Sequence, residues 1–177
     1  MKLFLKIAII LALLGLPLKG VHSQSLNEWL RLLKPEGKPP IVTNSFASDR
    51  LSHGHIWRVY LEANDPDGDM REVLYSVGEG RPGHRYMSFL IKREYRARLK
   101  GYVNVIISSP ETAGAEWAEL ILTLYIRDDR GNKSKDVVHP VSLKRGVLQE
   151  FPPSPFDSEG LESLGNIWVQ LYAPLGD

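Results

Sequence analysis

Three aspartates alternate within five residues of this chain, at Asp65, Asp67 and Asp69. Calcium prefers several oxygen ligands in a flexible loop, so this spacing could begin a calcium site. Pro66 and Gly68 stand between the aspartates and suggest another interpretation. Proline fixes φ and glycine allows a positive φ, which together predict a tight turn without a ligand. The sequence leaves both interpretations open, and the turn alone explains the residue types.

Two weaker groups of polar residues could also bind a metal. Asp128, Asp129 and Asn132 form a second acidic segment, which is also typical of a hairpin turn. His53 and His55 would share one face of an extended segment and could supply two zinc ligands, but the sequence offers no third ligand nearby. We expect both groups to be structural.

The common catalytic signatures are missing. The sequence has no nucleophilic-serine motif, phosphate-binding glycine loop or His-Glu-x-x-His helix. We therefore expect a non-enzyme whose only cofactor, if any, is calcium. A small carbohydrate-active or hydrolytic enzyme with paired carboxylates is kept as an alternative. Basic residues between Lys92 and Lys100, near Tyr95 and Tyr102, could contact a polyanionic surface polymer, although a solvated strand face explains them more simply.

Period-two alternation predicts the elements that would position these residues. Trp57, Val59, Leu61 and Ala63 fall on one face of a strand, and residues 86–100 alternate in the same way with a charged face. The acidic turns would join successive core strands and fix their register. The predicted strands are 41–46, 56–63, 73–77, 86–100, 102–107, 118–126 and 137–143. We expect an all-β, antiparallel immunoglobulin-like sandwich of about seven strands over residues 39–146.

The segments on either side of the predicted sandwich differ from it in composition. Ser25 and Glu28 have the spacing of a capping box, which predicts a short amphipathic helix over residues 25–34, followed by a linker to residue 38. Residues 147–177 read as an irregular, proline-rich tail with a final β-prone run. The residues expected to bind a partner lie in these segments: Leu26, Trp29, Leu30, Leu33, Trp168 and Tyr172.

The first 23 residues have the pattern of a secretory signal peptide. Lys2 and Lys6 precede an apolar run over residues 7–16, and cleavage is expected after Ser23. The run is too short to span a membrane. Cleavage would also remove Lys19 and change the net charge from +1 to −2, which does not favour nucleic-acid binding. We expect a periplasmic, extracellular or cell-surface protein that is not an integral membrane protein and, lacking cysteine, is stabilised by its core.

Residues 39–144 resemble the cadherin-like and bacterial immunoglobulin-like sandwich modules of exported proteins. The matching residues are Ala63-x-Asp65-x-Asp67-Gly68, Tyr75, Val77 and Asp129-x-Gly131-x-x-Ser134. The resemblance implies a sandwich, and it implies Asp65 and Asp67 as candidate calcium ligands. The Asp-Arg-Glu motif and the acidic inter-repeat linker of calcium-binding cadherins are not evident, which weakens the calcium implication.

Together these features predict an exported, non-catalytic immunoglobulin-like module for protein–protein or cell-surface interaction. The first alternative is a calcium-stabilised adhesion-type domain. The second is a small carbohydrate-active or hydrolytic enzyme on a sandwich. Such sandwiches have many functions, so the architecture does not choose among them.

Overall fold

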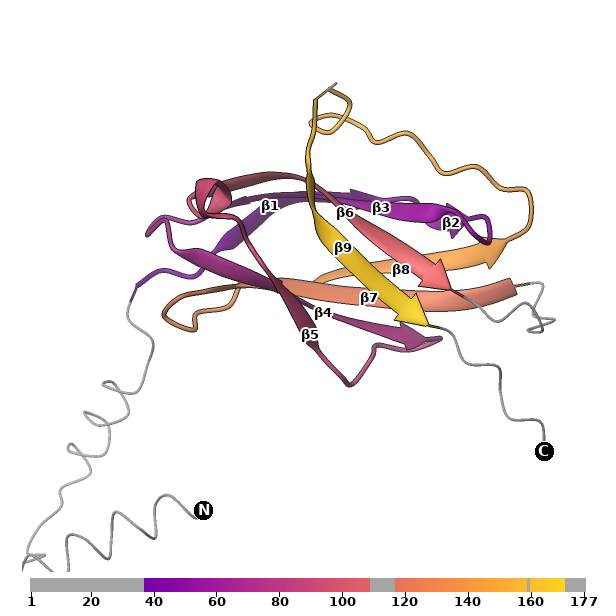
Figure 1. The fold of residues 1–177 in the computed structure, drawn as a ribbon, viewed down its shortest axis with the longest axis horizontal. Helices are drawn as coiled ribbons and strands as arrows, with labels where there is room; N and C mark the ends of the chain where they lie inside the picture. Colours follow the sequence, from indigo (N-terminus) through magenta and orange to yellow (C-terminus); the bar gives the residue numbers. More distant parts are fainter. Residues whose placement is uncertain (1–36, 109–116, 159, 171–177) are drawn as a thin grey trace, which may run out of the picture. The chain divides into compact units, whose positions relative to one another are not determined.

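The computed structural model describes residues 37–108, 117–158 and 160–170. The predicted signal peptide, the predicted helix over residues 25–34 and Tyr172 lie outside these residues. Two sheets face each other across a hydrophobic core, so the predicted all-β class is confirmed (Figure 1).

The two sheets contain four and five strands. The four-stranded sheet has the order β1 (Ile41–Ala47), β3 (Ile56–Asn64), β6 (Arg98–Ser108) and β9 (Ser163–Gln170). The five-stranded sheet has the order β2 (Arg50–Leu51), β8 (Val137–Lys144), β7 (Trp117–Asp128), β4 (Met70–Glu79) and β5 (Met87–Leu90). Strands β2 and β8, and strands β6 and β9, pair in parallel. Both sheets are therefore mixed, and the prediction of a purely antiparallel sandwich is wrong.

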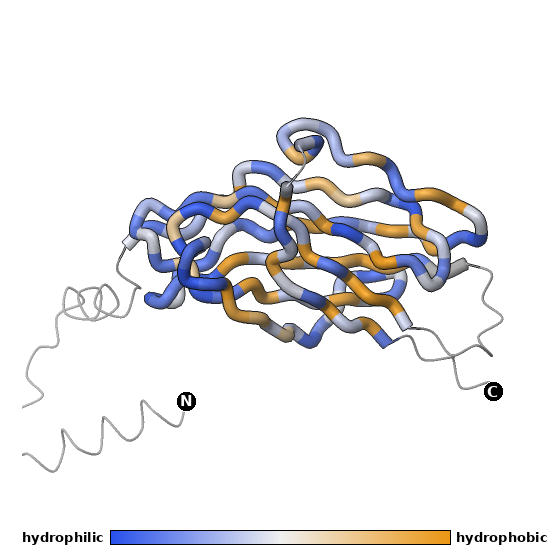
Figure 2. Tube along the Cα trace, turned by 45° about the horizontal axis from the view of Figure 1, so that its top comes forward, coloured by the Kyte–Doolittle hydropathy of each residue, from blue (hydrophilic) through white to orange (hydrophobic). Residues whose placement is uncertain are grey.

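Alternating apolar residues form the core, as the sequence predicts for the clearest strands. The alternating apolar residues of β3 from Trp57 to Ala63 are at most 1% exposed. Their counterparts in β7 from Leu120 to Ile126 are at most 2% exposed. Figure 2 shows hydrophobic and hydrophilic residues alternating along the strands, with hydrophilic residues at the turns. Burial of these apolar side chains is the main favourable term in folding, and the chain has no disulfide to add to it.

The single charged strand predicted over residues 86–100 is wrong. These residues form β5 in one sheet, the 3₁₀ helix η1 (Arg93–Tyr95), and the first residues of β6 in the other sheet. The chain must cross between the sheets here, so a continuous strand is impossible. Ile91 and Leu99 enter the core on either side of the crossing, while Arg93 stays exposed.

The last strand belongs to the sandwich, which therefore extends beyond residue 146. Strand β9 pairs with β6 and buries Leu164, Ile167 and Val169 in the core. The β-prone run at the end of the predicted irregular tail thus belongs to a core strand. The signal was weak because β9 alternates only after Gly165, beyond a shift in its register with β6.

The segment over residues 145–158 crosses the outer face of the four-stranded sheet (Figure 1). The Gln149 side chain donates to the carbonyl of Ile56 at 2.7 Å and accepts from the N–H of Arg58 at 3.2 Å. Strand β1 pairs with β3 only from Val59 onward, so this backbone would otherwise be open. The Gln149 amide thus continues the sheet where β1 has ended.

Candidate functional site

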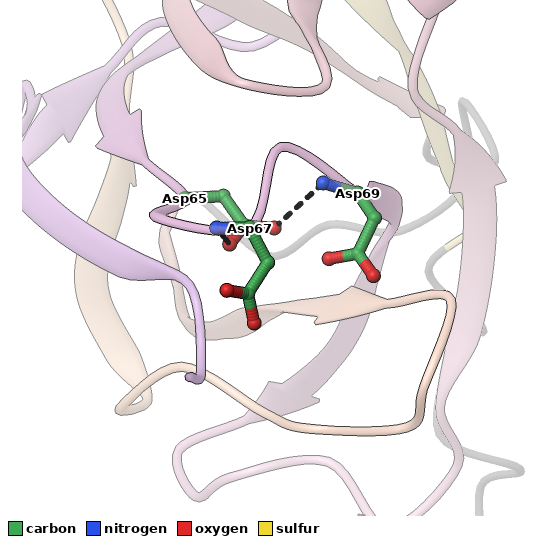
Figure 3. Close-up of side chains that lie close together, drawn as sticks. All are labelled: Asp65, Asp67 and Asp69. Carbon is green, nitrogen blue, oxygen red and sulfur yellow. Dashed lines mark hydrogen bonds between the residues drawn. The ribbon is translucent and has the colours of Figure 1, made fainter. Parts of the chain in front are cut away.

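The turn between β3 and β4 is closed by the carboxylate of Asp65. This carboxylate accepts the N–H groups of Asp67 at 3.0 Å and Asp69 at 3.2 Å (Figure 3). The Asp65 carbonyl accepts the N–H of Gly68 at 3.2 Å, and Gly68 has φ +75°. The sequence Asp-Pro-Asp-Gly-Asp thus forms this turn by local hydrogen bonds. Strands β3 and β4 lie in different sheets, so the expectation that the turn sets their mutual register is wrong.

The turn between β7 and β8 has the same construction. The carboxylate of Asp128 accepts the N–H groups of Arg130 at 2.9 Å and Asn132 at 2.7 Å. It also accepts from Asn132 Nδ2 at 2.8 Å. The Asp128 carbonyl accepts the N–H of Gly131, whose φ is +88°. The sequence analysis recognised two acidic turns but missed their equivalence, which is visible as the shared spacing Asp-x-x-Gly followed by Asp or Asn.

The two turns lie side by side at one end of the sandwich. The N–H of Asp129 donates to the carbonyl of Asp69 at 3.0 Å. Arg130 Nε lies 3.2 Å from Asp69 Oδ2, and Arg130 Nη1 lies 3.8 Å from Asp67 Oδ2. Arg96 donates to Asp129 Oδ2 at 2.9 Å. We call this group the acidic end; it consists of Asp65, Asp67, Asp69, Asp128, Asp129, Arg71, Arg96 and Arg130.

Asp69 is the one carboxylate of the acidic end with a buried, unpartnered oxygen in the described residues. Its Oδ1 is buried and has no hydrogen-bond partner. Burial raises the pKa of Asp69, and the negative charges of Asp65 and Asp128 raise it further. The positive charge of Arg130 lowers this pKa, but the net shift is upward. The folded protein therefore holds the charged form of Asp69 at a cost in free energy.

The predicted calcium ligands do lie together. Oxygens of Asp65, Asp67 and Asp69 are within 4.8 Å of one another, and this is the one such group of three His, Cys, Asp or Glu residues in the described part of the chain. Figure 3 shows the Asp67 and Asp69 carboxylates pointing the same way. Arg130 contacts both of them, and Asp67 Oδ2 also accepts the N–H of Lys38 at 2.7 Å. A cation would have to compete with these partners.

The other predicted site residues do not converge on a reactive centre. His53 and His55 are exposed and line a shallow depression, and the described residues place no third His, Cys, Asp or Glu beside them. The basic strip from Lys92 to Lys100 is divided between η1 and β6, and its Arg96 is bound to Asp129.

The predicted partner residue Trp168 is 67% exposed on β9. The remaining predicted partner residues lie outside the described residues; they are Leu26, Trp29, Leu30, Leu33 and Tyr172.

Sequence reasoning missed an apolar row on the outer face of the four-stranded sheet. Ile56 lies opposite Ile106, and Ile106 lies opposite Trp168, so the row crosses β3, β6 and β9. Ile56 is 48% exposed, and Ile106 is half-buried. The row depends on the register of three strands far apart in sequence, so no local pattern could have revealed it.

Beside this row, an aromatic cluster covers part of the same face. The Tyr60 ring lies 5.8 Å from the ring of Tyr102 and 5.6 Å from that of Phe156. The Arg58 guanidinium lies 4.9 Å from the centre of the Tyr102 ring. Tyr60 is therefore only 8% exposed, although the alternation of β3 places it on the outer face. Its burial depends on Phe156 from the distant crossing segment.

Comparison with known proteins gives little further information. No protein-family model matches the chain, and no curated protein matches it. A solved structure of the PKD domain of an M14-like peptidase from Thermoplasmatales archaeon SCGC AB-540-F20 is similar, with 13% identity and a TM-score of 0.34. The similarity covers 62% of this chain and 99% of that one. Within the described residues, no helix has the length and hydrophobicity of a membrane span. The assignment of the fold rests on the two sheets themselves.

Proposed function

We propose that this protein is an exported, non-catalytic immunoglobulin-like module that binds a protein partner in the periplasm or at the cell surface. The apolar row of Ile56, Ile106 and Trp168 carries this proposal. Exposed apolar side chains that are contiguous across three strands are typical of a protein-binding surface, whereas single exposed ones are common on any protein. An aromatic residue beside aliphatic ones is also the composition of an interface core.

The acidic end supports a non-catalytic role, because the first carboxylate of each turn already has structural partners. The carboxylates of Asp65 and Asp128 accept backbone N–H groups of their own turns. Three described depressions, each of about 430 Å³, contain at most one carboxylate each, from Glu150 or Asp157. Paired acid chemistry needs two carboxyl groups that face each other, so these depressions do not favour the hydrolytic alternative.

The proposal is tested by capture of the partner with variants of the apolar row. The tagged full-length protein is expressed in its native cells, cross-linked and purified, and the bound proteins are identified. We expect Ile56→Lys to lose the partner, because it places a charge within the apolar row. Val138→Lys is the matched control, since Val138 is 53% exposed on the other sheet. Equal capture by both variants would contradict the proposed surface.

Export is tested by the mass of the purified protein. We expect a mature chain that begins at Gln24 and is recovered from the periplasm or cell surface. Recovery of the intact chain from the cytoplasm would contradict export without affecting the proposed binding surface.

Calcium binding is a second proposal, favoured by the unpartnered Oδ1 of Asp69 beside the Asp65 and Asp67 oxygens. A cation there would relieve the repulsion that raises the pKa of Asp69. We expect millimolar Ca²⁺, but not Mg²⁺, to raise the melting temperature, and Asp67→Asn to abolish the increase. Arg130→Gln should enlarge the increase, because it removes the competing cation. A melting temperature that does not respond to Ca²⁺ in either the parent protein or Arg130→Gln would exclude the site.

A further inference from the structure

The four open edges of the two sheets are not equally protected. Strand β2 has two residues and β5 has four, so each offers little backbone to another strand. Strand β1 follows Pro39 and Pro40 and has an irregularity in register between Val42 and Asn44. Short strands, prolines and bulges are the features that prevent edge-to-edge pairing. Three of the four edges therefore have at least one such feature.

Strand β9 is the exception. It has eight residues, none of them charged and none of them proline. Its register with β6 is irregular only at its start and is continuous from Gly165 to Gln170. In the described part of the chain β9 pairs with β6 alone, so its other edge has open backbone N–H and C=O groups. The run of Ile167, Trp168 and Val169 also has high strand propensity.

The neighbouring edge of the second sheet adds apolar surface to this side. Strand β5 lies against β9, where the ring of Phe89 in β5 packs on Gly165 in β9. A Cβ added at Gly165 would lie only 2.9 Å from this ring. On β5, Met87 is 45% exposed and Leu90 is 70% exposed. Three large apolar side chains are thus exposed along the two edges on this side of the sandwich; they are Met87, Leu90 and Trp168.

We propose that the open edge of β9 pairs antiparallel with β9 of a second copy of this chain. A two-fold axis at Ile167 would place Trp168 of each copy opposite Asn166 of the other, on the same face. Because β9 has no charged residue, no like charges would meet in this pairing. The two four-stranded sheets would become one continuous sheet. The interface between the two copies would be self-complementary and, with two-fold symmetry, closed.

The proposed dimer rests on the proposed function, because both make the four-stranded sheet a binding element. The dimer forms through the edge of β9, whereas the partner binds the row centred on Ile106. The dimer is tested with the full-length protein by analytical ultracentrifugation over a wide range of concentration. We expect a monomer–dimer equilibrium, which Trp168→Lys abolishes. Ile41→Lys is the matched control, because Ile41 is 54% exposed on the opposite edge strand β1, and it should still dimerise. Asn166→Lys provides a second disruption if Trp168→Lys does not fold.

Backbone pairing is distinguished from simple side-chain contact by amide hydrogen exchange. We expect exchange of β9 amides to slow as the protein concentration rises, while exchange in β1 does not change. A monomer at all concentrations would overturn the proposal, as would a dimer whose β9 amides exchange at the same rate as in the monomer. A monomer that still captures its partner in a manner sensitive to Ile56→Lys would overturn self-pairing and leave the proposed function intact.

Discussion

The β3–β4 turn and the β7–β8 turn are built alike but are not equally satisfied. Each begins with an aspartate whose carboxylate accepts N–H groups two and four residues later, and each has glycine with a positive φ at the fourth position. In the second turn the fifth residue is Asn132, which donates its side-chain amide to Asp128. In the first turn the fifth residue is Asp69, which can only repel Asp65 when both are charged. The two turns thus differ by one side chain: the amide of Asn132 donates to Asp128, whereas the carboxylate of Asp69 repels Asp65.

Loss of the first carboxylate should have the largest effect, and it should be larger in the second turn. Asp128→Ala leaves two part-buried backbone N–H groups and one side-chain amide without their acceptor, so we expect a loss of about 3 kcal/mol in the free energy of unfolding. Asp65→Ala removes two hydrogen bonds but also relieves the repulsion of Asp69, so its loss should be smaller. Urea denaturation of both variants measures the difference. A larger loss from Asp65→Ala would contradict the conclusion that the second turn is the better satisfied of the two.

The two turn glycines should be equally important. Gly68 and Gly131 have φ angles of +75° and +88°, and a Cβ would meet only an ordinary contact at the first and nothing within 4 Å at the second. The cost of alanine is therefore purely that of the backbone conformation, about 1–2 kcal/mol at each position. Thermal unfolding of Gly68→Ala and Gly131→Ala measures it. Gly80→Ala is the control: Gly80 lies in another turn at φ +61°, with nothing within 4 Å of an added Cβ, so this variant gives the cost of a positive φ alone. Very different losses from the two variants would contradict the shared construction.

Asp69→Asn should convert the first turn into a copy of the second. The amide can donate to Asp65 and adds no charge, so we expect the protein to gain about 1 kcal/mol at neutral pH, the size of one hydrogen bond. The native pKa of Asp69 is raised above its ordinary value of 3.8, so the cost of its charge is present above the raised pKa. That cost disappears as the pH falls below 3.8, where Asp69 is protonated in both states.

Chemical denaturation of the parent protein and Asp69→Asn at several pH values tests this. The gain should shrink steadily from neutral pH toward pH 3. Asn132→Asp is the reciprocal variant, and it should lose stability at neutral pH. A gain that does not depend on pH would show that the charge of Asp69 is not the cause.

The sequence predicted the parts of the fold that depend on local chemistry. Alternation identified the buried faces of β3 and β7, and the Pro-x-Gly pattern around Asp67 identified a turn. It could not predict that β3 and β4 lie in different sheets, because a tight turn joins strands within a sheet or between sheets equally well. It missed the division of residues 86–100 and the parallel addition of β9 for a related reason. Both depend on which sheet accepts a strand, and that is decided by packing across the core.

The candidate site shows the same limit. Asp65, Asp67 and Asp69 could be grouped from their spacing, but their neutralisation by Arg130 could not, since Arg130 is brought there by the pairing of β4 with β7. The apolar row of Ile56, Ile106 and Trp168 likewise exists only in the register of three strands. Contacts within a turn are encoded locally, whereas contacts between turns or strands are encoded by the whole fold.

Removal of Arg130 should have the smallest effect, and its size tests what holds the two turns together. Arg130 is about half exposed, so solvent screens its ion pairs with Asp67 and Asp69. Arg130→Gln should therefore cost about 0.5 kcal/mol, less at high salt. The loss should be small because the N–H of Asp129 still donates to the carbonyl of Asp69, and β4 still pairs with β7. Arg50→Gln removes a similarly exposed pair with Asp49 and is the control. A loss from Arg130→Gln as large as that from Asp128→Ala would mean that charge, rather than backbone pairing, joins the turns.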